Sequence, residues 1–429
     1  MNTPLLIVIL IQLELKLMEM KKIKTEICIV GAGPAGATTS ITLSNMGIAH
    51  TIIDASEFPR DKTCGDAIDL NVVRVLNTIL PGFVSNELSD SKVFSPAAGL
   101  RFILPNGKIF DMVEKPSSPA GTIKPLFHIA KRIDFDNLLV AKLNSNFAQI
   151  HFGTRIEKIE RDGKIWKLHG TTKLGKIEIE TKMLVGADGA HSVVLRHIGD
   201  VKIDRRNYAG AVRQYWKGIE GIHKDKLIEF YFPKSLPLSY FWIFPLPNGE
   251  ANVGYGMASD YIARKNINVR KAFEELIKTD PFLAARFKNA TPLETVKGWG
   301  LPLSGSNRKA SGDGWILVGD AASIICPTTG EGIGSGMISA YTAALFLQRA
   351  FKENCYEEKM FTNYNREIHK RLKMDERVFK FVNTIPAWAF SAFINAVLSN
   401  RFLQNWIVKK EIKKWIKTAY TKPITVILD

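Results

Sequence analysis

The stretch from Thr25 to Asp54 constrains the fold of this chain most strongly. Its pattern predicts a strand, a glycine-rich turn, a helix, and a second strand that ends in a carboxylate. Gly31 permits a tight turn, Gly33 lets the backbone approach a pyrophosphate, and Gly36 lets the helix pack close to the strand. Asp54, eighteen residues after Gly36, stands where a carboxylate binds ribose hydroxyls. The stretch therefore predicts a dinucleotide site at a helix N-terminus.

Two later strands also end in an acid. Residues 183–187 precede Asp188-Gly189, and residues 314–319 precede Asp320. Ligands of open α/β sheets bind at the carboxyl ends of the strands, so these acids are expected near the same ligand. A glycine-rich turn at residues 330–334 and a helix over about 335–351 suit a second anionic group. One ligand that reaches all these positions is long, which favours FAD, and no second complete glycine fingerprint indicates a separate nicotinamide domain.

The composition limits the class of protein. A chain of 429 residues with 46% apolar and 23% charged residues is too long for one compact unit, so two subdomains are expected. The four cysteines lie far apart, which argues against a disulfide framework and a structural zinc site and fits a reducing cytoplasm. A net charge of +16 suits nucleic acid, anionic lipid or a phosphorylated substrate, or is only a solvated basic surface. No nucleic-acid-binding module is recognisable, so lipid or phosphate is preferred.

The alternation of patterns predicts an α/β protein with a discontinuous FAD-binding domain of the Rossmann type. This domain is expected to comprise residues 22–92, 128–206 and 303–355. Short strands over 93–127 and mostly strands over 207–302 predict an inserted antiparallel-sheet domain for the substrate. Its aromatic residues either enclose an apolar ligand or form an ordinary core. Residues 356–429 predict a helical segment.

The composition of the two ends of the chain raises the question of whether they contact a membrane. Residues 1–11 are apolar but too few to span a bilayer, and the extension 1–21 is assigned no role. The tail combines tryptophans with lysines, among them Trp388, Trp406 and Trp415. Such a tail suits a helix on the inner face of a membrane, or equally a lid with its lysines in water. The oligomeric state is left open.

A loop after Asp54 carries Cys64 close, in sequence, to the nucleotide site. A free cysteine is most often a buried filler, and the residues alone favour that interpretation. A proton donor or redox-active thiol would need partial exposure and a cationic neighbour such as Lys62 or Arg60. Near the start of a later helix, Arg132 would face a phosphate or is an ordinary exposed arginine.

Together these residues resemble the flavoprotein monooxygenase superfold of the p-hydroxybenzoate hydroxylase type, and within it the geranylgeranyl reductase family. The resemblance extends from about Ile23 to Phe351. Two motifs narrow it: Pro59-x-x-Lys62-x-Cys64-Gly65, and Tyr240-x-Trp242-x-Phe244-Pro245 with Gly254-x-Gly256. Leu195 stands where relatives often carry an arginine, and Asp66 where they often carry a glycine. These two departures put the exact substrate in doubt.

The resemblance implies a reductase in which reduced FAD delivers hydride to an isoprenoid carbon–carbon double bond. The substrate is a prenyl diphosphate, a prenyl lipid or a menaquinone side chain, and the electrons come from NADPH, NADH or a ferredoxin. It also places Cys64 beside the flavin and implies that Tyr240 and Trp242 form the prenyl channel. Cys64, Tyr240 and Trp242 are the implied catalytic residues. The implied cofactor-binding residues are Gly31, Gly33, Ala35, Gly36, Asp54, Ala55, Cys64, Gly65, Arg132, Ile156, Asp188, Gly189, Asp320, Gly332 and Ile333.

Three alternatives stay open. An FAD-dependent hydroxylase of aromatic or quinone substrates would share the cofactor residues. A flavin-dependent halogenase is less favoured, because its W-x-W-x-I-P signature is not reproduced at Tyr240–Pro245. The third alternative is not an enzyme: the chain would be a membrane-associated flavin-binding partner without catalytic turnover.

Overall fold

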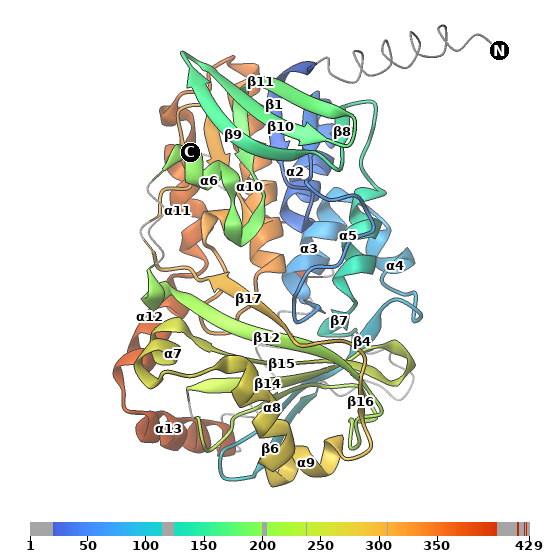
Figure 1. The fold of residues 1–429 in the computed structure, drawn as a ribbon, viewed down its shortest axis with the longest axis vertical. Helices are drawn as coiled ribbons and strands as arrows, with labels where there is room; N and C mark the ends of the chain where they lie inside the picture. The colour runs from blue at the N-terminus through green and yellow to red at the C-terminus, as the bar shows by residue number, and fades with distance from the viewer. Residues whose placement is uncertain are drawn as a thin grey trace, which may run out of the picture.

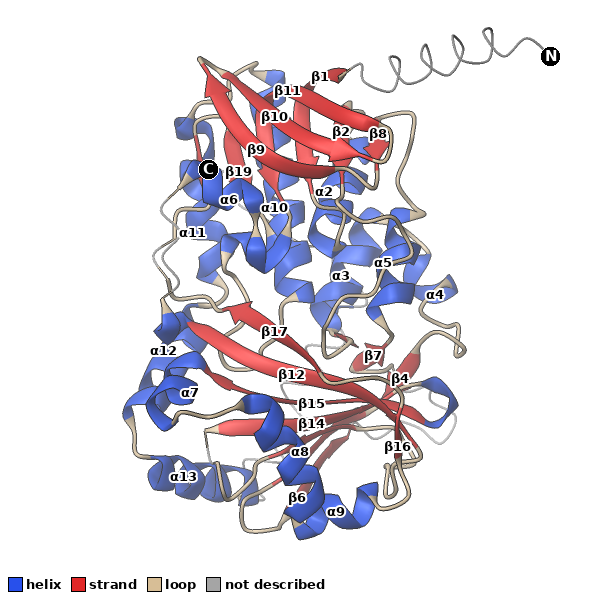
Figure 2. Cartoon of the chain, in the orientation of Figure 1, coloured by secondary structure: helices blue, strands red, loops and turns tan. Residues whose placement is uncertain are grey.

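The protein is described from a computed structural model that covers residues 20–113, 124–199, 204–236, 238–306, 308–400, 418–419, 424 and 426. One large sheet lies in the upper half of the molecule and the other in the lower half, with helices and connecting loops between them (Figures 1 and 2). The mixed α/β architecture is the predicted fold class.

The first sheet has the strand order β18-β19-β11-β1-β2-β8. Its central strands are parallel, and their bounds are β1 (Lys21–Val30), β2 (His50–Ile53), β8 (Ala148–His151), β11 (Gly175–Gly186) and β19 (Trp315–Leu317). The strand β18 (Ser311–Gly312) pairs antiparallel with β19. The meander of β9 (Arg155–Asp162) and β10 (Ile165–Thr172) extends from β11. All three strands predicted to end in an acid, β2, β11 and β19, therefore belong to one parallel sheet.

Small side chains allow the helices to pack closely on this sheet. The helix α2 (Pro34–Asn45) is rich in Ala, Thr and Ser and packs against α10 (Ile333–Lys352). Beside them lie α3 (Leu70–Ile79) and α5 (Arg132–Val140). The shorter helices are α4 (Phe83–Asn86) and α6 (Val193–Ile198).

The second sheet has the order β16-β12-β15-β14-β13-β5-β6, with β17 also paired to β12. Its strands are β5 (Gly99–Ile103), β6 (Ile109–Val113), β12 (Tyr208–Lys217), β13 (Ile228–Tyr231), β14 (Ser239–Pro245), β15 (Glu250–Ala258), β16 (Thr291–Pro292) and β17 (Lys297–Pro302). All pairs are antiparallel except β13 with β5. A small sheet of β3 (Ala67–Ile68), β7 (Phe127–Ile129) and β4 (Ser95–Ala97) lies near it.

The expectation of mostly strands over 207–302 missed three helices that lie against the second sheet. They are α7 (Ser259–Lys265), α8 (Val269–Thr279) and α9 (Pro281–Phe287). Phe273, Leu276 and Ile277 of α8 are buried and follow the helical i, i+3, i+4 spacing, so the sequence carried a signal for this helix. Phe273 stacks on Phe241 of β14.

The chain continues into α11 (Thr362–Lys370), α12 (Lys373–Thr384) and α13 (Ala387–Ser399), as predicted for a helical segment. The tail residues Trp406 and Trp415 lie outside the described residues, as does the apolar run at 1–11. Among the helices that the structure describes, none has both the length and the apolar character needed to cross a bilayer.

Candidate functional site

A single cavity of about 1540 Å³ is lined by residues of both large sheets. That volume exceeds the roughly 300–1,000 Å³ of an ordinary small-molecule pocket. Every residue predicted to act in catalysis or to hold the cofactor lines this cavity except Gly36. A cavity of this size suits a dinucleotide together with a second, apolar molecule.

The glycines of the first turn explain why Gly36 lies outside the cavity. Gly31 has a φ of 102°, and a Cβ there would stand 2.4 Å from the carbonyl oxygen of Ala187. A Cβ on Gly36 would stand 1.8 Å from the carbonyl oxygen of Gly31, so Gly36 serves helix packing. A Cβ on Gly33 would meet only Arg60, at 3.4 Å, and Gly33 opens toward the cavity at the N-terminus of α2. This is an open cradle of the kind that a pyrophosphate needs.

The carboxylate of Asp54 is buried and already hydrogen-bonded by the backbone. It accepts from the amide of Ala32 at 2.8 Å and from the amide of Ser56 at 2.8 Å. Each carboxylate oxygen can accept more than one hydrogen bond, so capacity remains for ribose hydroxyls. Arg60 lies 3.9 Å from the same carboxylate and 3.1 Å from Asp136.

The other two acids differ in their surroundings. Asp188 accepts hydrogen bonds from the Ser192 hydroxyl at 2.5 Å and from the amide of Val193 at 2.6 Å, so it holds the start of α6. Burial raises the pKa of Asp188 despite these bonds. Asp320 instead lies at the cavity with Lys62 Nζ at 3.8 Å. Ala35, Ala55, Ile156, Gly189, Gly332 and Ile333 contribute to the same lining.

The N-terminus of α10 differs from the expectation of an anion site. Glu331 accepts hydrogen bonds from the amides of Gly334 and Ser335 with its own carboxylate. Burial, and then repulsion from Asp69, raise the pKa of Glu331 to about 8. These amides are therefore occupied by a side chain of the same turn, which the sequence reasoning did not anticipate.

The cation beside Cys64 is Arg132, and not Lys62 or Arg60, which are nearer in sequence. Lys62 pairs with Asp320 and Arg60 with Asp136. Arg132 is buried and binds both oxygens of Asp136, at 2.6 and 2.7 Å. Burial opposes the charge on Arg132, but Asp136 and then Cys64 raise its pKa above the ordinary value. Cys64 is half-buried at the cavity wall, a setting that suits a functional thiol better than a filler.

Alternation along β14 turns Tyr240, Trp242 and Phe244 toward the cavity, and Phe241 and Ile243 toward α8 and α9. The opposing strand explains the glycines of the motif, because Gly254 and Gly256 pair with Trp242 and Tyr240. A Cβ on Gly254 would lie 2.0 Å from the Trp242 ring. Burial raises the pKa of Tyr240 to about 12, so its hydroxyl stays protonated. Further aromatic residues complete this wall: Phe102, Phe230 and Phe232.

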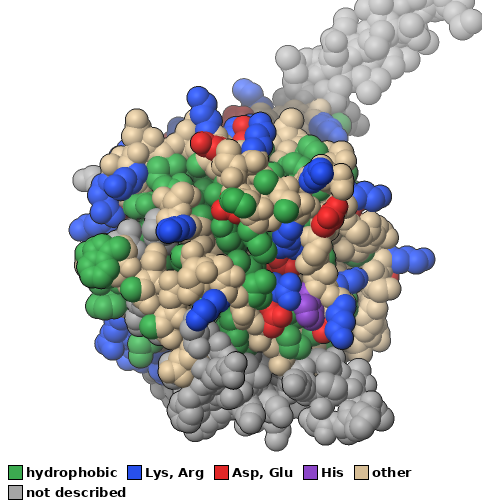
Figure 3. Space-filling model, turned by 90° about the horizontal axis from the view of Figure 1, so that it is seen from below, with side chains coloured by type: hydrophobic (Ala, Val, Ile, Leu, Met, Phe, Trp, Pro, Cys, Tyr) green, Lys and Arg blue, Asp and Glu red, His purple; other side chains and the backbone are tan. Residues whose placement is uncertain are grey.

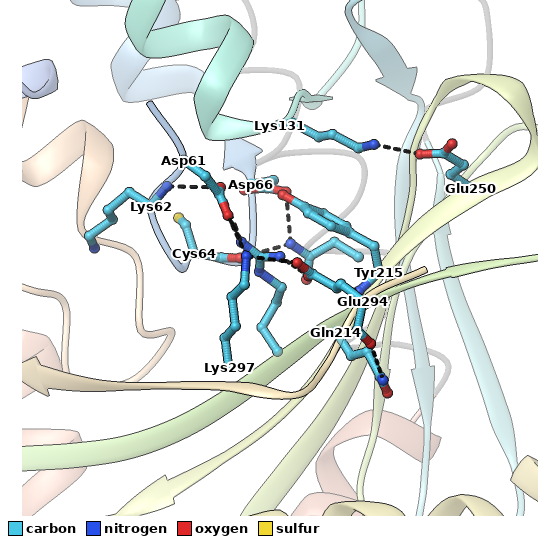
Figure 4. A network of polar contacts seen from close by, with 12 residues as sticks. Asp61, Lys62, Cys64, Asp66, Lys131, Gln214, Tyr215, Glu250, Glu294 and Lys297 are labelled. Carbon is cyan, nitrogen blue, oxygen red and sulfur yellow. Dashed lines mark hydrogen bonds and ion pairs between the residues drawn. The ribbon is translucent and has the colours of Figure 1, made fainter. Parts of the chain in front are cut away.

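A polar network joins the cysteine loop to the second sheet, and the sequence reasoning missed it (Figure 4). Asn252 accepts from Trp242 Nε1 at 2.9 Å and donates to the Cys64 carbonyl oxygen at 2.7 Å and to Asp66 at 2.8 Å. Tyr215 donates to the same oxygen of Asp66 at 2.7 Å. Asn252 pairs with Phe244 across the two strands, and a polar residue at a strand position opposite the motif was the available signal for it.

Ion pairs fix the other end of that loop. Arg213, 1% exposed, binds Asp61 at 3.2 Å and also Glu294. Lys297 binds both acids, at 2.8 Å each. The loop that carries Cys64 is thereby anchored to β12 and β17.

The chain is similar to known proteins in sequence and in fold. A family model described as FAD binding domain matches residues 24–377. A digeranylgeranylglycerophospholipid reductase of Methanococcus vannielii is 28% identical over 369 residues, which cover 83% of this chain and 86% of that protein. A menaquinone reductase of Mycobacterium tuberculosis is 26% identical, with 92% of this chain and 94% of that protein covered. A solved geranylgeranyl bacteriochlorophyll reductase-like protein from Thermoplasma acidophilum has a TM-score of 0.75 at 20% identity, covers 94% of this chain and 98% of its own, and shares the fold.

Proposed function

Because the chain belongs to the FAD binding domain family, we propose that this FAD-dependent oxidoreductase saturates carbon–carbon double bonds of an isoprenoid lipid. The names of the reductases to which it is similar support an isoprenoid substrate. The observation that carries the proposal is the continuity of the cavity. Strand ends suited to a dinucleotide and a wall of aromatic side chains line the same space.

The residues divide the task between them. Gly31, Gly33 and Asp54 would hold the phosphate and ribose part of FAD, and Asp320 with Gly332 and Ile333 would lie toward the flavin. FAD, when bound and reduced, supplies a hydride for the double bond. Tyr240 and Trp242 would orient the prenyl chain. An isolated alkene develops little charge that a protein dipole could stabilise, so orientation and exclusion of water must supply much of the rate.

The test is anaerobic. The FAD-loaded enzyme is reduced with dithionite and mixed with a glycerophospholipid carrying geranylgeranyl chains, or with menaquinone. We expect flavin reoxidation together with a product that gains two hydrogen atoms for each saturated bond. A hydroxylase would instead consume oxygen in a substrate-dependent way and would leave the alkene intact without oxygen. The same assay started with NADPH, NADH or reduced ferredoxin identifies the electron donor.

A hydrophobic surface on the last helices supports contact with a membrane. Met374, Val378, Phe381 and Trp388 of α12 and α13 are 66%, 44%, 58% and 74% exposed. Seen from below, hydrophobic and basic side chains lie on the same face of the molecule (Figure 3). We expect the Phe381→Ser, Trp388→Ser double variant to sediment less with anionic liposomes while it retains FAD. Equal sedimentation of both proteins would contradict this part of the proposal.

A further inference from the structure

Asp66 is the acid nearest in sequence to Cys64 and takes no part in the binding of FAD or lipid proposed above. It lines the cavity, yet its side chain is completely buried. Its φ is 67°, a left-handed conformation in which glycine is favoured and aspartate is tolerated. Such conformations in residues other than glycine gather at functional sites. The position therefore combines a buried ionisable group, a less favourable backbone and a place in the wall of the cavity.

The hydrogen bonds of Asp66 determine where its proton lies. Trp242 Nε1 can only donate, so the oxygen of the Asn252 amide faces the indole and the amide nitrogen faces Asp66. Oδ2 of Asp66 accepts from this nitrogen at 2.8 Å and from the Tyr215 hydroxyl at 2.7 Å. Oδ1 is buried and has no hydrogen-bond partner among the residues that the structure describes. In the protonated acid the proton therefore belongs on Oδ1.

The groups around Asp66 leave both its protonated and its ionised form accessible near neutral pH. Burial raises its pKa, the hydrogen bonds from Tyr215 and Asn252 lower it, and Arg213 and Arg132 lower it further, with a result of about 6. Arg213 is itself paired with Asp61 and Glu294, and Arg132 with Asp136. An acid with a pKa near the working pH can both give up a proton and regain it.

We propose that Asp66 is the proton source of the reaction and that the proton on Oδ1 passes to the double bond. Because Oδ1 is covered in the free protein, the side chains over it must move aside when the lipid binds. This inference rests on the proposed function. Saturation consumes one π bond and forms two C–H bonds. One carbon receives the hydride, with both electrons, that reduced FAD supplies, and the other carbon receives the proton from Asp66. The carboxylate left behind is held by Tyr215 and Asn252 until it takes a proton from solvent.

Asp66→Asn tests the proposal, because asparagine tolerates the left-handed backbone and its amide oxygen can accept the same two hydrogen bonds. The FAD-loaded variant is compared with wild type and with Asp162→Asn, a matched change at an exposed, lysine-paired aspartate. In infrared titrations we expect one carboxylic-acid band, present in wild type and in Asp162→Asn, to be missing in Asp66→Asn, while the band of Glu331 remains. In anaerobic single turnover with a geranylgeranylated glycerophospholipid, we expect Asp66→Asn to be slower by about 10²- to 10⁴-fold.

Tyr215→Phe supplies a second, independent readout. The Tyr215 hydrogen bond lowers the pKa of Asp66, so its removal should shift the pH profile of single turnover to higher pH. A role limited to holding the loop would leave the profile in place.

The outcomes separate this inference from the proposed function. Wild-type speed and profile in Asp66→Asn would overturn the inference alone. Loss of turnover in Cys64→Ser with full turnover in Asp66→Asn would give the proton to Cys64 instead. If wild type does not saturate the lipid at all, the proposed function is wrong and the inference falls with it.

Discussion

Replacing Gly254 by alanine tests whether the aromatic wall depends on the glycine across the strand pair. A Cβ there would stand 2.0 Å from Cζ2 of Trp242 and 2.4 Å from the carbonyl oxygen of Val212. Both atoms are buried, and the carbonyl belongs to the sheet, so the indole must move. Overpacking of a core costs about 1–3 kcal/mol, and losing the Trp242 to Asn252 hydrogen bond adds about 0.5–1.5 kcal/mol. Alanine lowers the entropy of the unfolded chain and so restores about 0.4–1 kcal/mol, which leaves a loss of about 0.5–4 kcal/mol.

Gly256→Ala is the matched control on the same strand. Its Cβ would meet Ala211 Cβ at 3.3 Å and the Trp242 ring at 3.6 Å, contacts that small shifts relieve. We expect the free energy of unfolding in urea to fall clearly for Gly254→Ala and to change by less than about 1 kcal/mol for Gly256→Ala. The alkene-saturation rate should fall only in the first variant. Equal stability of the two variants would refute the argument that Trp242 requires a glycine opposite it.

Three further predictions concern the cofactor, the loop anchor and pH. Asp54→Ala removes a charged acceptor worth about 1.5–3 kcal/mol, so the Kd for FAD in a fluorescence titration should rise about 10- to 100-fold, and an unchanged Kd would exclude Asp54 from the site. Arg213→Met removes the buried cation of the anchor, while Lys297 still pairs with the partly exposed Asp61 and Glu294. Urea unfolding should therefore show a loss of about 1–3 kcal/mol, and an unchanged free energy of unfolding would contradict the anchor. Burial lowers the pKa of His128 from 6.5 to about 4. Between these two pH values the unfolded chain binds more protons than the folded protein, so the free energy of unfolding falls by up to about 3 kcal/mol as the pH drops from 6.5 to about 4. His128→Asn should remove that part of the acid sensitivity, and identical pH curves for the two proteins would contradict it.

Local patterns carried the prediction of the first sheet. The glycines at 31 and 36 are required by contacts within a few residues of the turn or with the adjacent strand, and they leave a readable spacing. The acids after β2, β11 and β19 could be placed at one sheet edge because parallel strands share the direction of their carboxyl ends. The helices α7 to α9 were not predicted, because aromatic residues typical of strands dominate much of residues 207–302. The apolar residues of α8 nevertheless follow the 3.6-residue period of a helix.

The sequence alone determined the fold class, the expectation of FAD and the two motifs, because each depends on residues close together in the chain. The tertiary structure decided which groups surround those motifs. Arg132 lies beside Cys64 although Lys62 and Arg60 are nearer in sequence. Glu331 accepts hydrogen bonds from the backbone amides at the start of α10. The bond between Asn252 and Asp66 spans 186 positions of sequence. Side-chain pairing over such separations follows from how the two sheets face each other, which local spacing does not encode.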